Sequence, residues 1–272
     1  MDRSKIIQYY EKMIGFLIKK TFFDLWDNLF RVALLNLGFI ASVAFPVFVP
    51  GLLLAVPALS IVTMLVGILW CAVYLAAVSY SLKTLSDYGS FGFGDFFRNL
   101  KTVWPIGLVM GGLIFLLWFL GTLIIPFYLN ISSLIGLFLA AVVFWSAVVG
   151  VLSFQFFFAI RARLDTKITK VIKKSFVFFF DNAGFCLFSF IHNLVLLAIS
   201  VFLAFLFPGP AGILLYLDEA MRLRLLKYDW LEANPPKEGT RRPQIPWDAL
   251  LIEDRERTGT RTLKSFIFPW KD

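Results

Sequence analysis

Three long stretches without a charged residue constrain what this chain can fold into. They cover residues 32–82, 102–160 and 182–217. A helix needs about 20 apolar residues to cross the hydrocarbon core of a bilayer, and each stretch is longer than that. Only 16% of the residues are charged, against roughly 25% in ordinary soluble domains. The sequence therefore predicts an all-α integral membrane protein, because a helix satisfies its own backbone hydrogen bonds in lipid.

Each uncharged stretch contains a proline corner and is long enough to fold back on itself. We expect about six membrane segments arranged as three helical hairpins. The limbs are residues 29–45 and 52–82, 103–125 and 131–160, and 183–207 and 211–217, with corners at 45–51, 126–130 and 208–210. On the second hairpin, small residues recur about four residues apart, a spacing that lets helix backbones approach closely. They are Gly107, Gly111 and Gly112 on the outgoing limb and Gly136, Ala140, Ser146 and Gly150 on the return limb.

An aromatic, Asn-containing motif with an acidic residue precedes each hairpin, at residues 22–31, 93–100 and 178–183. Each copy holds a polar pair: Asp27-Asn28, Arg98-Asn99 or Asp181-Asn182. Asp and Asn side chains cap free N–H groups at helix starts. We expect the pairs to cap helices, the alternative being a shared site for a lipid headgroup or a partner helix.

The distribution of basic residues predicts the topology. Of the 26 Lys and Arg residues, six lie in 1–31, three in 83–101, six in 161–174 and eleven in 222–271, and the three corners have none. By the positive-inside rule, both termini and both long connections lie in the cytoplasm. The short, uncharged corners leave no outward domain, so the recognised molecule is expected to be a lipid, a membrane partner or something cytoplasmic.

The return limb of the third hairpin is too short to cross a membrane by itself. Only residues 211–217 are uncharged before Asp218, Glu219 and Arg222, and seven helical residues rise only about 10 Å. Either this limb is a re-entrant or interior helix, or its charges lie within the bundle. Asp218 and Arg222 stand four residues apart, a spacing at which the two charges can neutralise each other.

The two ends of the chain differ from the predicted transmembrane domain, residues 29–230. Within 1–28, residues 5–20 have the periodicity of an amphipathic helix, which either lies flat on anionic lipid or docks in a cytoplasmic cap. Residues 231–272 form a Pro-rich, charged tail. Because the tail keeps many large apolar residues, we expect an extended segment that docks on its own bundle or on a partner.

A few polar residues inside the apolar stretches are the candidate functional residues. His192 and Asn193 lie in the third hairpin, Asn36 in the first and Gln155 in the second. Polar groups at membrane depth are functional candidates, but they also hold helices together through hydrogen bonds. The charged residues Asp218, Glu219 and Arg222 complete the set.

No catalytic, cofactor or metal-binding signature accompanies these residues. The sequence lacks a His pair, a Cys pair and a phosphate-binding loop in the required context. Cys71 and Cys186 lie inside apolar runs, where small buried apolar roles are usual. The basic segment 161–174 can bind anionic lipid headgroups, although the topology rule accounts for it equally well.

The first hundred residues resemble the YesL-like family of bacterial membrane proteins. The resembling residues are Leu25-Trp26-Asp27-Asn28-Leu29, Leu34-Leu35-Asn36-Leu37, Phe45-Pro46 with Pro50-Gly51 and Ala55, and Gly92-Phe93 with Asp95-Phe96-Phe97-Arg98 and Lys101. The resemblance implies a polytopic protein of the bacterial inner membrane, associated with carbohydrate uptake. It implies no catalytic or binding residues.

These observations favour a non-enzymatic accessory or scaffold subunit, one associated with a transporter. A second hypothesis is a small transporter or lipid-handling protein with its site between the hairpins, since polar residues lie inside them. A third, an intramembrane enzyme, would have to use lone residues on separate helices.

Overall fold

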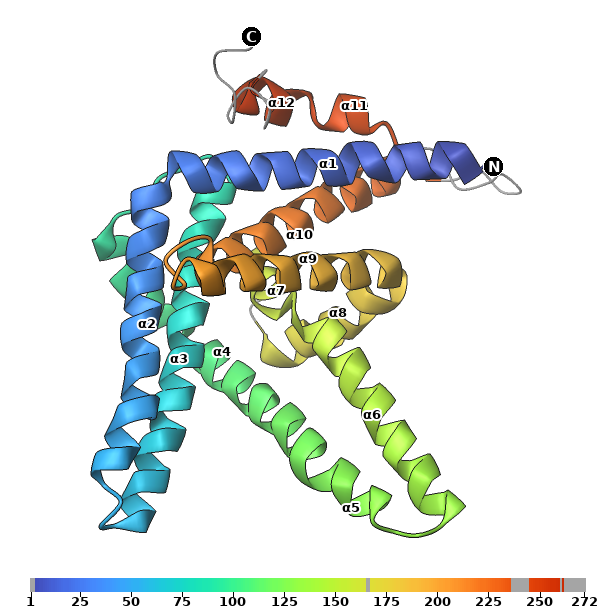
Figure 1. Ribbon diagram of the computed structural model, residues 1–272. Helices are drawn as coiled ribbons and strands as arrows, with labels where there is room; N and C mark the ends of the chain where they lie inside the picture. The colour runs from blue at the N-terminus through green and yellow to red at the C-terminus, as the bar shows by residue number, and fades with distance from the viewer. Residues whose placement is uncertain (1–2, 165–166, 236–244, 260, 262–272) are drawn as a thin grey trace. The chain divides into compact units, whose positions relative to one another are not determined.

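The computed structural model describes the backbone of residues 3–164, 167–235, 245–259 and 261, and side chains from Met13 onward within those ranges. The regular structure in this part of the chain is entirely helical (Figure 1). The chain divides into two compact units: a hairpin unit, Phe30–Asp218, and a terminal unit that combines Met1–Leu29 with Glu219–Asp272. Residues 219–230 therefore fold with the two chain ends, and not with the transmembrane domain to which the sequence assigned them.

The hairpin unit contains the long apolar helices. Three prolines lie inside α2 and α4 without ending them. The elements are α2 (Leu29–Leu52), α3 (Pro57–Ser86), α4 (Phe93–Phe119), a π-helical turn η1 (Leu120–Ile124), α5 (Ile125–Leu129), α6 (Leu134–Phe154), α7 (Phe157–Arg163), α8 (Ile168–Asp181), α9 (Ala183–Phe202) and the first half of α10 (Gly209–Ala233).

The terminal unit is built from both chain ends. It contains α1 (Arg3–Asp27), the second half of α10, α11 (Trp247–Leu250) and α12 (Ile252–Thr258). Met13, Leu17, Leu223, Trp247 and Leu251 are buried in its core. The burial of Met13 and Leu17 favours the cap-helix alternative for the amphipathic segment. The tail is helical over α11 and α12 where the sequence predicted an extended segment, and residues 262–272 lie outside the described residues.

All three predicted corners are displaced along the chain, the third because α9 ends at Phe202 and α10 begins at Gly209. Helix α2 continues through Pro46 and Pro50 to Leu52, so the first turn falls at residues 53–56. The hydroxyl of Ser60 donates to the Pro50 carbonyl at 2.9 Å and ties the two limbs together at this turn. Helix α5 includes Pro126, and the second turn falls at 130–133. Apolar helices tolerate internal prolines where neighbouring groups satisfy the freed backbone, which is why proline positions misplaced the corners.

Helices α2, α3 and α4 pack closely through glycines. A Cβ added at Gly107 would lie 2.4 Å from Val73 Cα, and one at Gly111 would lie 2.8 Å from Leu69 Cδ2. The close packing predicted for Gly107 and Gly111 is confirmed, whereas a Cβ added at Gly112 would meet nothing within 4 Å. Gly38 faces the Tyr74 ring in the same way, and the Tyr74 hydroxyl donates to the Leu35 carbonyl at 2.8 Å. The glycine contacts hold α4 against α3, and the Tyr74 contacts hold α3 against α2.

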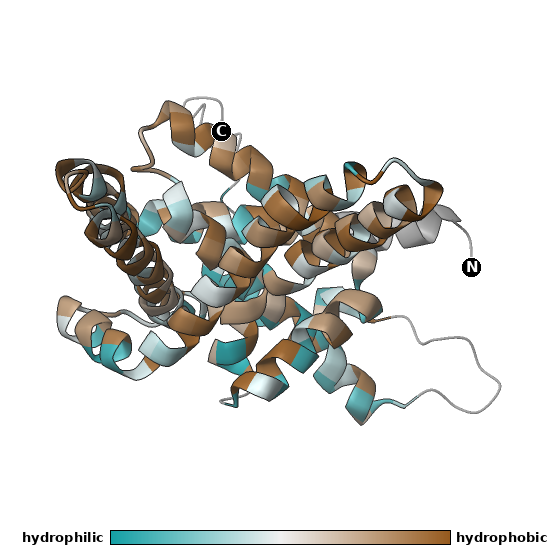
Figure 2. Ribbon diagram, turned by 90° about the horizontal axis from the view of Figure 1, so that it is seen from below, coloured by the Kyte–Doolittle hydropathy of each residue, from teal (hydrophilic) through white to brown (hydrophobic). Residues whose placement is uncertain are grey.

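Five helices in the described part of the chain are long and apolar enough to cross a membrane. They are Leu29–Leu52, Pro57–Ser86, Phe93–Leu129, Leu134–Arg163 and Ala183–Phe202. Long hydrophobic stretches run along the helices in Figure 2, and large apolar side chains such as Phe48, Leu134 and Phe202 are exposed. Helix α10, the predicted sixth segment, is not among the five.

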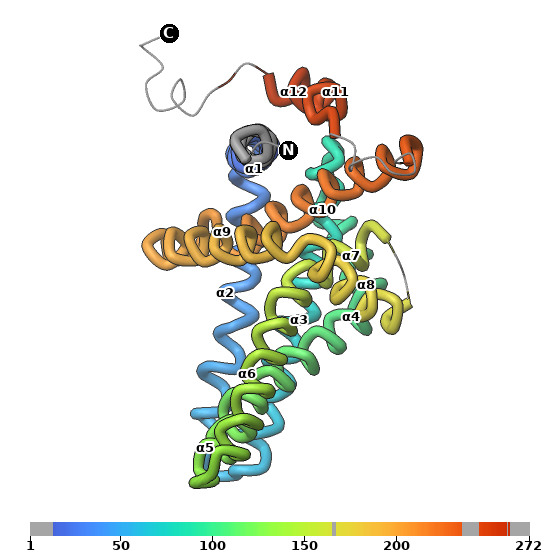
Figure 3. The backbone as a smooth tube through the Cα atoms, turned by 90° about the vertical axis from the view of Figure 1, so that its right-hand side faces the viewer, coloured from blue at the N-terminus to red at the C-terminus, as the bar shows by residue number. Residues whose placement is uncertain are grey.

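Helix α9 does not run parallel to the first hairpin. In both Figure 1 and Figure 3, α9 lies crosswise to α2, whereas α2 and α3 run alongside each other. The third predicted hairpin, α9 and the start of α10, is thus oriented differently from the first.

In the first and third copies of the Asn-containing motif, the asparagine amide bonds to the end of the preceding helix. The amide of Asn28 donates to the Asp24 carbonyl at 3.0 Å, and that of Asn182 donates to the Phe178 carbonyl at 3.2 Å. Asn182 makes no side-chain capping bond to α9. In the second copy, Asp95 accepts from the Gly92 N–H and caps the start of α4. The capping prediction for the three polar pairs was therefore wrong for Asn182, and in the second copy the capping residue is Asp95.

Candidate functional site

Asn36 holds the turn that joins α9 to α10. Its fully buried amide donates to the carbonyls of Leu206 at 3.0 Å and Pro208 at 2.8 Å, and its oxygen accepts from the Ala211 N–H at 2.9 Å. Gly209 has a φ of +61°, and a Cβ there would lie 2.3 Å from the Asn36 amide nitrogen. The structure therefore gives Asn36 a fixed helix-linking role.

Gln155 links the end of α6 to the start of α9. Its amide nitrogen donates to the carbonyls of Leu152 and Cys186, both at 2.9 Å. Cys186 is buried, as its apolar surroundings predicted. Gln155 thus makes the kind of interhelical bond that the sequence offered as the alternative to a functional role.

His192 stacks on a buried tyrosine. Its ring centroid lies 4.1 Å from that of Tyr216, with 27° between the planes. The Tyr216 hydroxyl lies 3.2 Å from Oγ of Ser189, so α9 and α10 meet through this cluster. Asn193, the neighbour of His192, is also buried.

Some polar atoms near this cluster and at the end of α6 lack hydrogen-bond partners. Among the described residues they include Nδ1 of His192, Oδ1 of Asn193, Oγ of Ser153 and Oε1 of Gln155. Buried polar atoms are nearly always satisfied by protein or water. These atoms therefore mark positions where a water molecule or a small polar ligand would be stabilised.

Asp218 pairs with Arg163 of α7, so its predicted pairing with Arg222 is wrong. Nε of Arg163 donates to Oδ1 of Asp218 at 3.0 Å, and a second bond joins Nη2 to Oδ2. The same guanidinium donates to Ser86 at 2.9 Å and to Asp87 at 3.0 Å. Arg163 thus binds both carboxylate oxygens of Asp218, a bidentate geometry that strengthens the pair.

Glu219 lies in a second buried cluster, formed in the terminal unit with α1. Nζ of Lys20 lies 3.2 Å from Oε1 of Glu219, and the same ammonium also pairs with Asp24. The Thr21 hydroxyl donates to the other Glu219 oxygen. Lys20 and Glu219 are 0% and 1% exposed, so a cation and two carboxyl groups share one enclosed space.

Burial raises the pKa of Glu219 to about 8, because an enclosed carboxylate loses its hydration. The negative charge of Asp24 adds to this rise, and the Lys20 ammonium opposes it. Burial lowers the pKa of Lys20, but Glu219 and Asp24 outweigh this effect and the net shift is upward. Lys20 therefore shares this enclosed space with a Glu219 carboxyl group whose raised pKa favours its protonated form.

Three contacts hold the tail helices within the terminal unit. Nη1 of Arg222 lies 2.7 Å from Oδ1 of the buried Asp254. Arg261 donates to both carboxylate oxygens of Asp27, at 2.9 and 3.0 Å. Nζ of Lys19 donates to the Gly259 carbonyl at 3.1 Å. Sequence reasoning missed these contacts, since no local pattern connects residues that lie 32 to 240 positions apart.

The terminal unit contains an open groove of about 600 Å³ between α1 and α12. Its lining includes Gly15, Phe16, Lys19, Arg255 and Glu256. A Cβ added at Gly15 meets nothing within 4 Å. Space for a partner's side chains is therefore available at this position.

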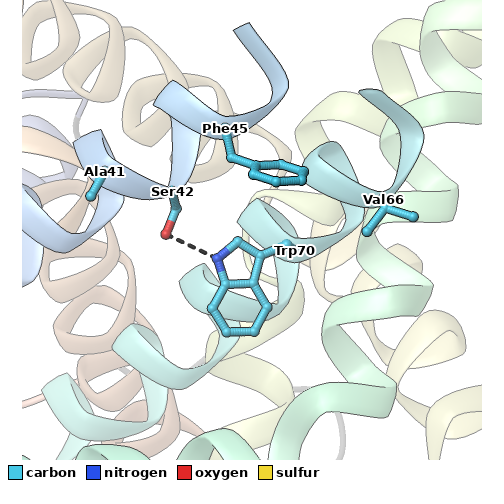
Figure 4. A pocket seen from close by; sticks show the side chains of 5 residues that line it. All are labelled: Ala41, Ser42, Phe45, Val66 and Trp70. Atoms are coloured by element: carbon cyan, nitrogen blue, oxygen red, sulfur yellow. Dashed lines mark hydrogen bonds between the residues drawn. The ribbon is translucent and has the colours of Figure 1, made fainter. Parts of the chain in front are cut away.

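The hairpin unit contains an apolar groove beside α2 and α3, shown in Figure 4. It has a volume of about 440 Å³ and is lined by Ala41, Ser42, Phe45, Val66 and Trp70. The indole N–H of Trp70 donates to Oγ of Ser42 at 3.2 Å. A second groove of about 270 Å³, which extends to the start of α4, shares Ser42 and Trp70 with the first. The two volumes thus adjoin along one side of the first hairpin.

The described residues contain no cluster of three or more His, Cys, Asp or Glu side chains that could hold a metal ion. No protein-family model, curated protein or solved structure matches this chain. The chemistry of the described residues is therefore the basis for any functional assignment.

Proposed function

We propose that this protein is a non-enzymatic accessory or scaffold subunit of a membrane complex, and that its partner binds the terminal unit. The observation that carries this proposal is the joining of the two chain ends. Arg261 is paired with Asp27, and Arg222 with Asp254, and between α1 and α12 this unit leaves a groove open at Gly15. Such a surface fits a protein segment that carries both polar and apolar side chains.

The hairpin unit supports the same proposal. Asn36 and Gln155 use their amide nitrogens in bonds between elements, and Asp218 is neutralised by Arg163. A transporter would be expected to leave some of these polar groups facing a solvent path. Their structural use favours a scaffold over a transporter.

The surroundings and partner class follow from the sequence. The distribution of Lys and Arg supports a multi-pass protein with both termini in the cytoplasm and with contacts to anionic lipid headgroups. The resemblance to the YesL-like family supports the bacterial inner membrane and a carbohydrate transporter as the partner. These assignments are part of the proposal.

Filling the groove tests the proposal. Gly15→Phe places an aromatic ring where an added Cβ meets no atom, and Gly94→Phe makes the same change at a comparably open position at the start of α4. After crosslinking in cells and purification in mild detergent, we expect a partner with the parent chain and the Gly94 variant, but not with the Gly15 variant. Equal recovery with both variants would contradict the proposal.

Deleting the tail is a poorer test. Trp247, Leu251 and Asp254 are buried in the terminal unit, so removing residues 233–272 would destabilise the unit itself. A point substitution in the groove separates loss of a partner from loss of the fold.

The groove in Figure 4 favours a second candidate function, lipid handling. Its apolar lining suits an acyl chain, and Ser42 and Trp70 offer the only polar side-chain atoms among its five lining residues. Ala41→Phe would fill it. We expect native mass spectrometry to show fewer retained lipids for this variant than for Leu137→Phe, a change at an exposed position on α6; equal lipid retention would remove this candidate.

A further inference from the structure

The two ends of α9 are fixed near the charged ends of other helices in the hairpin unit. At one end, Asn36 binds the turn between α9 and α10. Asn36 is seven residues after the first residue of α2, or about 10 Å of helix. At the other end, Gln155 binds the first turn of α9 through Cys186. Gln155 is eight residues before Arg163, the last residue of α7, or about 12 Å if the intervening chain is helical.

The start of α10 connects the depth of Asn36 to the depth of the charged helix ends. Gly209, its first residue, lies against Asn36. Asp218, nine residues later, pairs with Arg163, which also contacts Ser86 and Asp87 at the end of α3. The uncharged segment 211–217 therefore rises from the level of Asn36 to that of the charged helix ends. It does not need to cross a membrane, which accounts for its short length.

We propose that α9 and the first half of α10 form an in-plane hairpin in the leaflet on the charged side of the membrane. The chain then crosses the bilayer four times, through α2, α3, Phe93–Leu129 and Leu134–Arg163. Four crossings keep both chain ends on one side, as the charge distribution requires. An α9 that lies in the membrane plane beside a membrane-crossing α2 accounts for the crosswise orientation of the two helices in Figures 1 and 3.

The exposed surface of this region fits a lipid monolayer. Ile191, Val195 and Phe202 of α9 are exposed apolar side chains. Helix α8, which leads into α9, contributes Lys173 and Lys174 to a groove of about 310 Å³ that also contacts Val177. Apolar side chains beside lysines suit the boundary between acyl chains and phosphate headgroups. The partner of this surface is the phospholipid of one leaflet.

Depth-dependent fluorescence quenching tests the proposal in the full-length protein. Cys71 and Cys186 are replaced by Ala, and single cysteines at Ile191, Val195 and Phe202 are labelled in vesicles that contain phospholipids brominated at shallow or deep acyl positions. We expect the same ratio of shallow to deep quenching at all three positions. Exposed positions Leu137, Trp145 and Val151 of α6 serve as the control, because a crossing helix carries them to different depths.

The outcomes separate the possible arrangements. Deep quenching at Ile191, near the middle of α9, combined with shallow quenching at Phe202, its last residue, would show a crossing helix and overturn the proposal. Equal depths on α9 with varying depths on α6 would support it. Labels on both helices that escape acyl-chain quenching would show that neither is inserted, which would also overturn it. If replacing Cys186 impairs folding, the buried thiol can be retained, because the labelling reagent is selective for exposed cysteines.

Discussion

The carboxylate of Asp218 and the guanidinium of Arg163 form a buried, two-point contact between α10 and α7. The Asp218 side chain is 0% exposed and that of Arg163 is 8% exposed. The two residues lie 55 positions apart in the chain. Asp218, which makes the apolar limb of the third hairpin short, therefore anchors that limb to the end of another helix.

Removing one member of this pair should be strongly destabilising. Arg163→Met leaves the Asp218 carboxylate buried without its cation, and losses of this kind cost about 3–5 kcal/mol. Thermal unfolding in mild detergent measures the effect. Arg98→Met is the matched control, since the Arg98–Asp95 pair is 78% and 47% exposed and should contribute no more than about 1 kcal/mol. Equal losses of stability in the two variants would show that the buried pair is not important for folding.

The packing of α4 on α3 predicts a contrast between two glycines of the same helix. Gly107→Ala would place a Cβ 2.4 Å from the Val73 backbone, whereas Gly112→Ala would meet no atom within 4 Å. We expect the first variant to lower the unfolding temperature, because the two helices must separate to fit the methyl group. The second should leave it unchanged or raise it, since Ala favours helix over Gly. The reverse order would contradict the packing of α4 on α3.

The sequence predicted the helices well because the signals for them are local. The uncharged stretches predicted the long apolar helices, and the glycine spacing predicted the contacts of Gly107 and Gly111. Proline positions misled at the corners, because Pro46 and Pro50 are accommodated inside α2. Local patterns thus predicted where helices form more reliably than where they end.

The partners of the charged residues could not be predicted from the sequence. A buried acidic residue such as Glu219 requires a cation, but the chain offers 26 Lys and Arg residues. The partner is Lys20, which lies 199 positions away. The same limit applies to the third hairpin, because the short limb 211–217 could be recognised while the orientation of α9 across α2 could not.

Asn36 provides a test of the turn before α10. Asn36→Leu removes two donated bonds and one accepted bond while keeping a similar side-chain volume. With about 1 kcal/mol for each bond, we expect a loss of roughly 2–3 kcal/mol in unfolding free energy. Thermal unfolding in mild detergent measures this loss. Ser146→Ala, which removes only a bond to the carbonyl one turn earlier in an exposed part of α6, should keep the stability of the parent protein, and equal stability in all three proteins would contradict the role of Asn36.

The cluster of Lys20, Asp24 and Glu219 predicts a stability that depends on pH. The pKa of Glu219 is raised from 4.5 to about 8 in the folded protein, so the folded state binds more protons than the unfolded state between these values. Stability is therefore highest at the acidic end of this window and falls as the pH rises towards 8. The raised pKa of Lys20 adds no slope in this window, since its contribution is lost only above the ordinary value of 10.5.

Glu219→Gln isolates this contribution to the pH dependence. Glutamine resembles the protonated carboxyl group, so the variant should keep its unfolding temperature between pH 5 and 8 where the parent protein loses stability. Glu253→Gln is the control, because Glu253 is 70% exposed in its pair with Arg257 and should leave the slope unchanged. An unfolding temperature that falls equally with pH in the parent and in Glu219→Gln would mean that the buried carboxyl group is not the source of the dependence.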